Sequence, residues 1–202
     1  MSVEAGPGPK TRTSMGIVNV PNGLSVSRLF LGASALGLIH AGMFGWALVL
    51  FLLAAITDTL DGYVARLLHQ ETAFGRQLDP MIDKLLIAAV LIFLVAVPGG
   101  GVPAWMVAVI VSRELIIQWL RSMMEGKGVA FGAKSAGKLK TVLQCAAIVA
   151  ALLALAMAPD APSWVVSARD VLLWAAVLLT IYSGVEYFAA AAPLLREDRA
   201  GG

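Results

Sequence analysis

Residues 58–83 read DTLDGYVARLLHQETAFGRQLDPMID and carry four aspartates between two strongly apolar segments. An ionisable group at the centre of a membrane-spanning helix costs roughly 2.5–3.5 kcal/mol on insertion scales. Four uncompensated carboxylates would therefore approach or exceed about 10 kcal/mol on that scale. We expect a bound cation among these side chains, and a divalent metal ion is the simplest candidate.

The composition of the whole chain indicates a membrane protein. Of its 202 residues, 59% are hydrophobic and only 14% are charged, and the mean hydropathy is +0.83. Soluble domains carry about 25% charged residues. We therefore expect an all-α integral membrane protein with one domain. The single cysteine, Cys145, excludes an intrachain disulfide.

Six stretches are long and apolar enough to be membrane helices, because about 30 Å of hydrocarbon must be crossed. Prolines and glycines mark the gaps between them. The expected spans are 24–40, 44–68, 80–97, 103–124, 135–157 and 171–191. They lie in a catalytic membrane domain over residues 15–192. Residues 1–14 are expected to be a disordered tail, and residues 193–202 a polar C-terminal tail.

The distribution of lysine and arginine predicts the orientation. With six spans, these residues fall on the two termini, on the loop after the second span and on the loop after the fourth. The opposite loops hold only Arg169. The positive-inside rule then places both termini and the acidic stretch on the cytoplasmic side of the cell inner membrane. A cleaved signal peptide over Met15–Ala35 is the alternative for the first span.

The spacing of the four aspartates predicts a metal site. Asp58 and Asp61 are three residues apart, Asp79 and Asp83 are four apart, and either spacing puts a pair on one face of a helix. A loop containing Gly75 is expected to fold the two helices back, so that the faces converge. An oxygen-only site suits Mg²⁺ or Mn²⁺. Because magnesium keeps positions open for phosphate oxygens, such a site implies a phosphorylated ligand.

Three neighbouring residues suggest how that ligand is bound. Gly62 costs roughly 1 kcal/mol relative to alanine inside a helix, and Ala65 lies three residues further on. Together they leave a bare patch where a phosphate or a flat ring can approach the backbone. Arg66 supplies a cation for a phosphate oxygen. The alternative is that Gly62 and Ala65 are only small packing residues.

The stretch resembles the signature of the CDP-alcohol phosphotransferases. Its spacing is D-x2-D-G-x2-A-R-x8-G-x3-D-x3-D, from Asp58 to Asp83. The resemblance implies a six-helix bundle with a cytoplasm-facing polar cavity, usually a homodimer, that moves a substituted phosphate from a CDP-linked donor to an alcohol. It also implies two metal ions and a role for Asp83 as the base. The residues that it places at the donor are Asn22, Ser25, Gly62, Ala65, Arg66, Thr72 and Gly75.

Three further segments resemble bacterial phosphatidylglycerophosphate synthases within that family. They begin at Asn19, Ser112 and Ser135 and read NVPNGLSVSR, SRELIIQWLR and SAGKLKT. The resemblance implies CDP-diacylglycerol as donor and glycerol 3-phosphate as acceptor, in contact with membrane lipids and without a nucleic-acid partner.

An acceptor that carries its own phosphate needs cations beyond the metal site. Charges inside an apolar helix mark a functional site by default, and Arg113 with Glu114 fits that description. The candidates for the phosphate are Arg28, Arg113, Arg121, Lys138 and Lys140. Three alternatives stay open: a structural ion pair for Arg113 and Glu114, lysines that reach lipid headgroups, and Arg28 as a membrane anchor.

Other functions also remain possible. The same chemistry could use another acceptor, either phosphatidylglycerol, as in a cardiolipin synthase, or an inositol phosphate. A divalent-cation transporter could use the aspartates as a permeation site, although the second and third helices are apolar away from the acidic stretch. A metal-binding scaffold without activity is a further alternative.

Overall fold

In the computed structural model the chain folds into helices joined by short loops. The backbone is described for residues 20–68, 73–126 and 135–200, and side chains within 27–57, 84–124 and 139–192. These residues contain helices and no strand, which confirms the all-α class. The helices are α1 (Val20–His40), α2 (Phe44–Leu68), α3 (Ala73–Ala96), α4 (Ala104–Gly126), α5 (Ser135–Ala156) and α6 (Ser163–Ala200).

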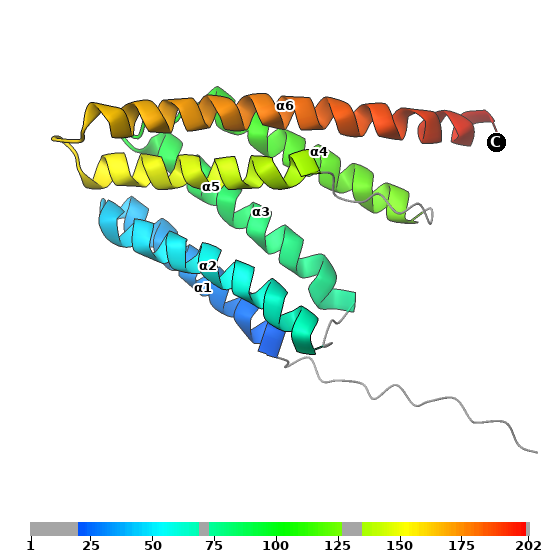
Figure 1. Ribbon diagram of the computed structural model, residues 1–202, viewed down its shortest axis with the longest axis horizontal. Helices are drawn as coiled ribbons and strands as arrows, with labels where there is room; N and C mark the ends of the chain where they lie inside the picture. Colours follow the sequence, from blue (N-terminus) through cyan, green and yellow to red (C-terminus); the bar gives the residue numbers. More distant parts are fainter. Residues whose placement is uncertain (1–19, 69–72, 127–134, 201–202) are drawn as a thin grey trace, which may run out of the picture.

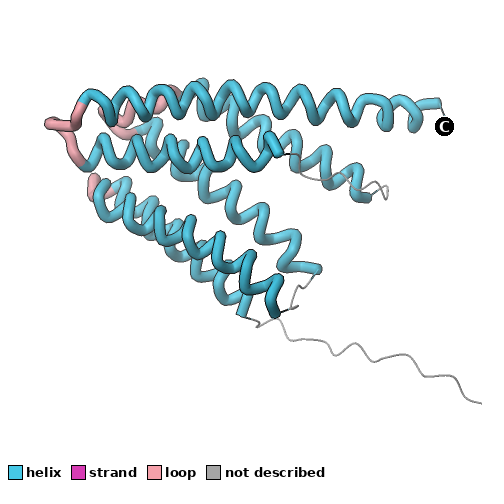
Figure 2. The backbone as a smooth tube through the Cα atoms, viewed as in Figure 1, coloured by secondary structure: helices cyan, strands magenta, loops and turns pink. Residues whose placement is uncertain are grey.

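The bundle consists of two helix pairs, α1 with α2 and α5 with α6, and of two helices, α3 and α4, that run obliquely to the α5–α6 pair (Figure 1). Helices α1 and α2 pack side by side, as do α5 and α6. Helix α3 contacts α1, α4 and α5, and α4 packs against α6. The described loops all lie at one end of the molecule (Figure 2). The C-terminal end of α2 and the N-terminal end of α3 lie at the opposite end (Figure 1).

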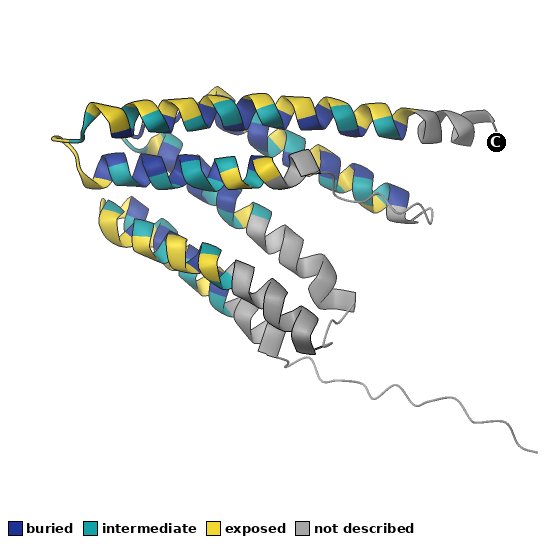
Figure 3. Cartoon of the chain, viewed as in Figure 1, coloured by how far each residue is buried: buried dark blue, intermediate teal, exposed yellow. Residues whose placement is uncertain are grey.

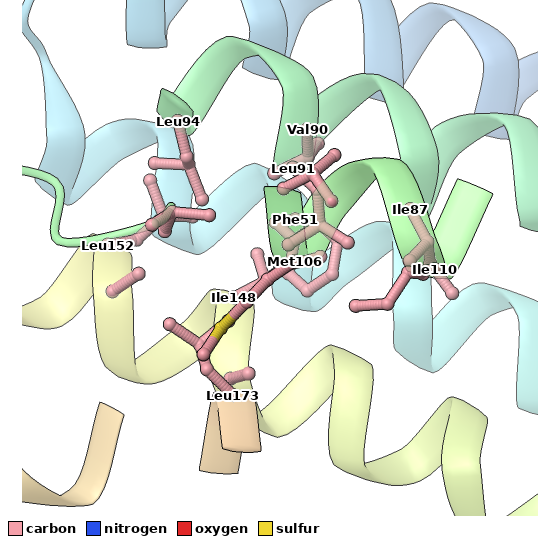
Figure 4. Close-up of a cluster of buried hydrophobic side chains, with 14 of the residues drawn as sticks. Phe51, Ile87, Val90, Leu91, Leu94, Met106, Ile110, Ile148, Leu152 and Leu173 are labelled. Carbon is pink, nitrogen blue, oxygen red and sulfur yellow. The ribbon is translucent and has the colours of Figure 1, made fainter. Parts of the chain in front are cut away.

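The core lies between these helices and is almost entirely aliphatic. Burial is concentrated on the inward faces of α3, α4 and α5, and exposed residues lie on the outside (Figure 3). Figure 4 shows Phe51, Leu91 and Ile148 meeting from three different helices in one cluster. Burying a side chain of this size stabilises a fold by roughly 1.5–3 kcal/mol.

The outer surface is apolar as well, as expected of a protein in lipid. Large side chains such as Phe30, Trp119 and Val185 are more than half exposed. Among the described residues, the segments Leu139–Ala156 and Ser163–Ala192 are long and apolar enough to cross a membrane. Shorter apolar helices cover Phe44–Thr57 and Lys84–Ala96.

The predicted helix boundaries agree with the structure for α2, whose residues are the expected ones, and were wrong for α3. Helix α3 begins at Ala73 and not at Pro80, so Gly75 lies in its first turn and not in a loop. A proline removes one backbone donor and disfavours the preceding turn, but it does not forbid a helix. The segment before Pro80 contains helix-forming residues, and the helix continues through it.

Helix α6 also differs from its expected bounds. It begins eight residues earlier, at Ser163, and the residues expected to form a tail continue it to Ala200. The additional first turns of α6 contain Arg169, whose charge is offset by hydrogen bonds to an aspartate and to backbone carbonyls. Its Nε donates to Asp170 at 2.9 Å, and its Nη1 donates to the carbonyls of Gly99 and Gly100 at 3.5 and 3.3 Å. A charge with these partners does not have to end the helix.

Candidate functional site

The acidic motif occupies the adjoining ends of two consecutive helices. Asp58 and Asp61 lie in the last three turns of α2, and Asp79 and Asp83 lie in the first half of α3. The helical spacings that the sequence predicted are therefore present in the backbone. The four side chains lie outside the described residues, and among the described ones no cluster of His, Cys, Asp or Glu could hold a metal.

The predicted donor residues are distributed over three helices. Asn22 and Ser25 lie in the first turns of α1, and Gly62, Ala65 and Arg66 follow the first aspartates on α2. Gly75 is in α3. The side chains of all these residues, and Thr72 entirely, fall outside the described part of the chain.

A buried charged cluster begins one residue after the motif. Lys84 directly follows Asp83 on α3, and consecutive Cα atoms are about 3.8 Å apart. From Lys84 the cluster extends to Arg113 and Glu114 on α4 and to Lys140 on α5. The last metal-binding candidate, Asp83, and one cation of the cluster, Lys84, thus lie in the same turn of α3.

Glu114 is the centre of this cluster. It is 8% exposed and forms a direct ion pair with Lys140, which is itself 3% exposed. Its Oε1 lies 3.5 Å from Arg113 Nη1, and its Oε2 lies 3.9 Å from Lys84 Nζ. Lys84 Nζ also donates to Gln118 Oε1 at 2.8 Å. One carboxylate is therefore shared by three cations from α3, α4 and α5.

Arg113 uses only part of its guanidinium in these contacts. Nη1 faces Glu114, whereas Nε and Nη2 are buried and have no hydrogen-bond partner among the described residues. Nε and Nη2 form one edge of the guanidinium, the pair that binds a phosphate through two parallel hydrogen bonds. A buried donor without a partner costs roughly 1–3 kcal/mol. Such an edge is therefore expected to be filled by a ligand or by water.

A second arginine of α4 lies close by and shares an aromatic neighbour with the first. Arg121 Nη2 donates to the hydroxyl of Tyr187 on α6 at 2.8 Å. The Cζ atoms of Arg113 and Arg121 lie 5.5 and 6.0 Å from the centroid of the Tyr187 ring. Both guanidinium groups are thus within cation–π range of one ring.

A cavity of about 150 Å³ lies beside Glu114. Lys84, Thr141 and Gln144 give it polar walls, and Ile87, Ala88 and Ile110 complete the lining. It is polar and roomy enough to hold ordered water, which requires roughly 30 Å³ per molecule. Hydration here would lower the cost of burying the charges around Glu114.

The predicted acceptor residues are only partly brought together. Arg113 and Lys140 meet at Glu114, and Arg121 is next to Arg113 through Tyr187. Arg28 is 2% exposed on α1, which disfavours an exposed membrane anchor. The side chain of Lys138 lies outside the described residues.

Three members of the cluster were missed by sequence reasoning: Lys84, Gln118 and Tyr187. Polar residues inside the apolar segments of α3 and α4 were the available signal for the first two. Tyr187, in the second half of α6, gave no comparable signal, because its role depends on which helix packs against it.

Comparisons with known proteins agree with the predicted family. The model of the family described as CDP-alcohol phosphatidyltransferase matches residues 18–182. The CDP-diacylglycerol–glycerol-3-phosphate 3-phosphatidyltransferase of Bacillus subtilis is 42% identical over 164 residues, which cover 80% of this chain and 79% of that protein. Enzymes with the same name from Cereibacter sphaeroides and Pseudomonas fluorescens are 33% and 35% identical, over 90% of this chain and 99% and 94% of theirs.

Proposed function

The chain belongs to the CDP-alcohol phosphatidyltransferase family, and we propose that it transfers the phosphatidyl group from CDP-diacylglycerol to glycerol 3-phosphate. The products are phosphatidylglycerophosphate and CMP. The observation that carries the proposal is an identity of 33–42% with relatives named for this reaction, along 80–90% of this chain. The relatives reported above include none named for transfer to phosphatidylglycerol or to an inositol phosphate.

The buried arginine edge supports a phosphorylated acceptor. Arg113 offers Nε and Nη2 together, which matches two oxygens of a phosphate monoester. Arg121 contributes a second guanidinium on the same side of α4. Lys140 is held by Glu114, so its part is to fix that carboxylate and, through it, Arg113. Lys138 and Arg28 complete the proposed set.

The donor diphosphate requires a metal. Asp58, Asp61, Asp79 and Asp83 would hold two Mg²⁺ ions, or Mn²⁺, because four carboxylates make a hard, oxygen-only donor set. Bound there, the ions supply neutralisation of the charge that develops on the diphosphate and make CMP a better leaving group. The helical backbone at all four positions, with pairs spaced three and four apart, is compatible with such a site.

The proposed role of Asp83 is to accept the proton of the acceptor hydroxyl. The hydroxyl oxygen forms a bond to the phosphorus that bears diacylglycerol, and the bond from this phosphorus to CMP breaks in line. CMP leaves with the bonding electrons, and the proton passes to the carboxylate of Asp83. The position of Lys84 next to Asp83 supports this role, because it joins the base to the acceptor cluster by one peptide bond.

The residues assigned to the donor act by shape and charge. Gly62 and Ala65 leave backbone accessible on α2, and Arg66 binds a phosphate oxygen. Asn22 and Ser25 would contact the cytidine from the first turns of α1. Gly75, in the first turn of α3, and Thr72 would border the same site.

The proposed setting is the inner membrane, with six spans, both termini in the cytoplasm and a homodimeric assembly. A cytoplasm-facing polar cavity would let soluble glycerol 3-phosphate reach a donor whose acyl chains stay in lipid. The described helices argue against cation transport in particular. Phe51, Leu94, Ile148 and Leu152 form an apolar cluster toward the loop end of the bundle, and this cluster disfavours a polar path through the described part of the chain.

The test is an acceptor panel with purified protein and CDP-diacylglycerol. Glycerol 3-phosphate, phosphatidylglycerol and an inositol phosphate are each supplied with Mg²⁺ and with a chelator, and both CMP release and the lipid product are measured. We expect turnover with glycerol 3-phosphate alone, lost on chelation. Turnover only with phosphatidylglycerol or inositol phosphate would refute the proposed acceptor, and absence of CMP release with any of them would refute the transferase itself.

A further inference from the structure

Tyr187 joins the two arginines of the acceptor cluster from a different helix. It is 3% exposed on α6, and both arginines belong to α4. Its ring lies within 6.0 Å of either guanidinium carbon, and its hydroxyl accepts a hydrogen bond from Arg121. One side chain therefore contacts two cations at once.

Two guanidinium groups beside one ring repel each other unless something offsets the repulsion. Residues 113 and 121 are eight apart on α4, about 12 Å along the helix axis and about 80° apart around it. Their long side chains would separate into different directions if nothing held them. The face of an aromatic ring attracts both cations, and the hydroxyl adds a charge-assisted hydrogen bond to one of them.

The same helix also makes room for Arg113. Gly184 lies three residues before Tyr187 on α6, and a Cβ atom there would stand 3.4 Å from Arg113 Cγ and 3.8 Å from its Nε. On helix α6, Gly184 therefore leaves space for the aliphatic part of the Arg113 side chain, and the ring of Tyr187 packs against its guanidinium. Glu114 fixes Nη1 on another side, which leaves the Nε and Nη2 edge without a hydrogen-bond partner among the described residues.

We propose that Tyr187 is a positioning residue for the acceptor: it holds Arg113 and Arg121 together so that the phosphate of the acceptor meets a preformed pair of guanidinium groups. The proposal rests on the proposed function, because it assigns the acceptor phosphate to this cluster. It predicts that Tyr187 affects use of the acceptor and leaves use of CDP-diacylglycerol unchanged.

The test compares Tyr187→Phe and Tyr187→Leu in the purified, full-length protein. The phenylalanine variant keeps the ring and loses the hydrogen bond to Arg121, so we expect the KM for glycerol 3-phosphate to rise about threefold to fivefold. The leucine variant also loses the aromatic ring, and we expect its KM for glycerol 3-phosphate to rise about tenfold or more. The KM for CDP-diacylglycerol should stay within about twofold of the wild type.

The matched control is Tyr182, which lies on the same helix and is 63% exposed. Tyr182→Phe and Tyr182→Leu should leave both KM values unchanged. A double variant then separates positioning from packing. If Tyr187 acts partly through Arg113, Tyr187→Leu should raise the acceptor KM by a smaller factor in the Arg113→Lys background than in the wild type, because interacting sites are not additive.

The outcomes are distinct from those that test the function. If the wild type does not use glycerol 3-phosphate, the proposed function fails. If it does, but Tyr187→Phe leaves the acceptor KM unchanged, or Tyr187→Leu raises the donor and acceptor KM values equally, Tyr187 only packs in the core and the inference is overturned. Full additivity with Arg113→Lys would overturn it as well.

Discussion

Two arginines, the buried Arg169 and the partly buried Arg113, differ in how completely the protein satisfies their hydrogen-bond donors. Arg169, next to the loop between α3 and α4, donates to Asp170 and to the carbonyls of Gly99 and Gly100. Arg113, in the middle of α4, contacts Glu114 through Nη1, and its buried Nε and Nη2 lack partners among the described residues. Buried polar groups are normally hydrogen-bonded. The contacts of Arg169 are those of a structural residue, whereas the unpartnered nitrogens of Arg113 are what the proposed acceptor site requires.

The largest effect is expected beside the Arg113 cluster, at Asp83. Asp83→Asn removes the proposed base and one metal ligand, so CMP release should fall by at least about 1000-fold. The matched change at the other arginine is Asp170→Asn, which removes a partner of Arg169 and should leave turnover near wild type. Turnover by Asp83→Asn within tenfold of the wild type would remove Asp83 from the mechanism.

The second prediction concerns the stability of the folded protein when the glycines in the loop beside Arg169 are changed. Gly99 and Gly101 both have positive φ, 79° and 65°, so alanine costs roughly 1–2 kcal/mol at either position. A Cβ at Gly101 would also overlap the guanidinium of Arg169, whereas space around Gly99 is open. Gly101→Ala should therefore destabilise the protein by about 2–4 kcal/mol, because Arg169 also loses hydrogen bonds.

Thermal unfolding in detergent measures this difference. We expect a lower Tm for Gly101→Ala than for Gly99→Ala, with both variants keeping wild-type KM values at a temperature where they are folded. Equal Tm values for the two variants would mean that the contact between Arg169 and the loop contributes little.

A smaller effect is expected where α6 faces Arg113. The Cβ of Gly184→Ala would make ordinary contacts with Arg113, so the KM for glycerol 3-phosphate should stay within about twofold. Gly184→Leu overfills the same space and should raise this KM by about fivefold through displacement of Arg113. Steady-state kinetics with the acceptor varied measures both. A larger effect of alanine than of leucine would show that crowding of Arg113 is not the cause.

The sequence predicted those parts of the molecule that depend on local pattern. Hydropathy located the six helices, and charge inside an apolar helix drew attention to Arg113 and Glu114, which the structure places in one charged cluster. The start of α3 was missed because Pro80 was taken as a boundary, whereas the helix continues through it. Local rules of this kind give preferences that tertiary packing can override.

The partners of the charged residues could not be predicted in the same way. Glu114 pairs with Lys140 and Lys84 across two helix contacts, and a sequence pattern does not specify which helices face each other. The role of Tyr187 depends on α6 packing against α4. The alternative that Arg113 and Glu114 form a structural pair is correct for Nη1 and does not account for Nε and Nη2.

The most direct test exchanges each of the two arginines for lysine and measures the KM for glycerol 3-phosphate in the two variants. Lysine keeps the charge but cannot offer two parallel hydrogen bonds. We predict that Arg113→Lys raises this KM by about tenfold to 100-fold with an unchanged donor KM, and that Arg169→Lys lowers only the Tm. An unchanged acceptor KM in Arg113→Lys, or an equal rise in Arg169→Lys, would contradict the assignment of the acceptor phosphate to Arg113.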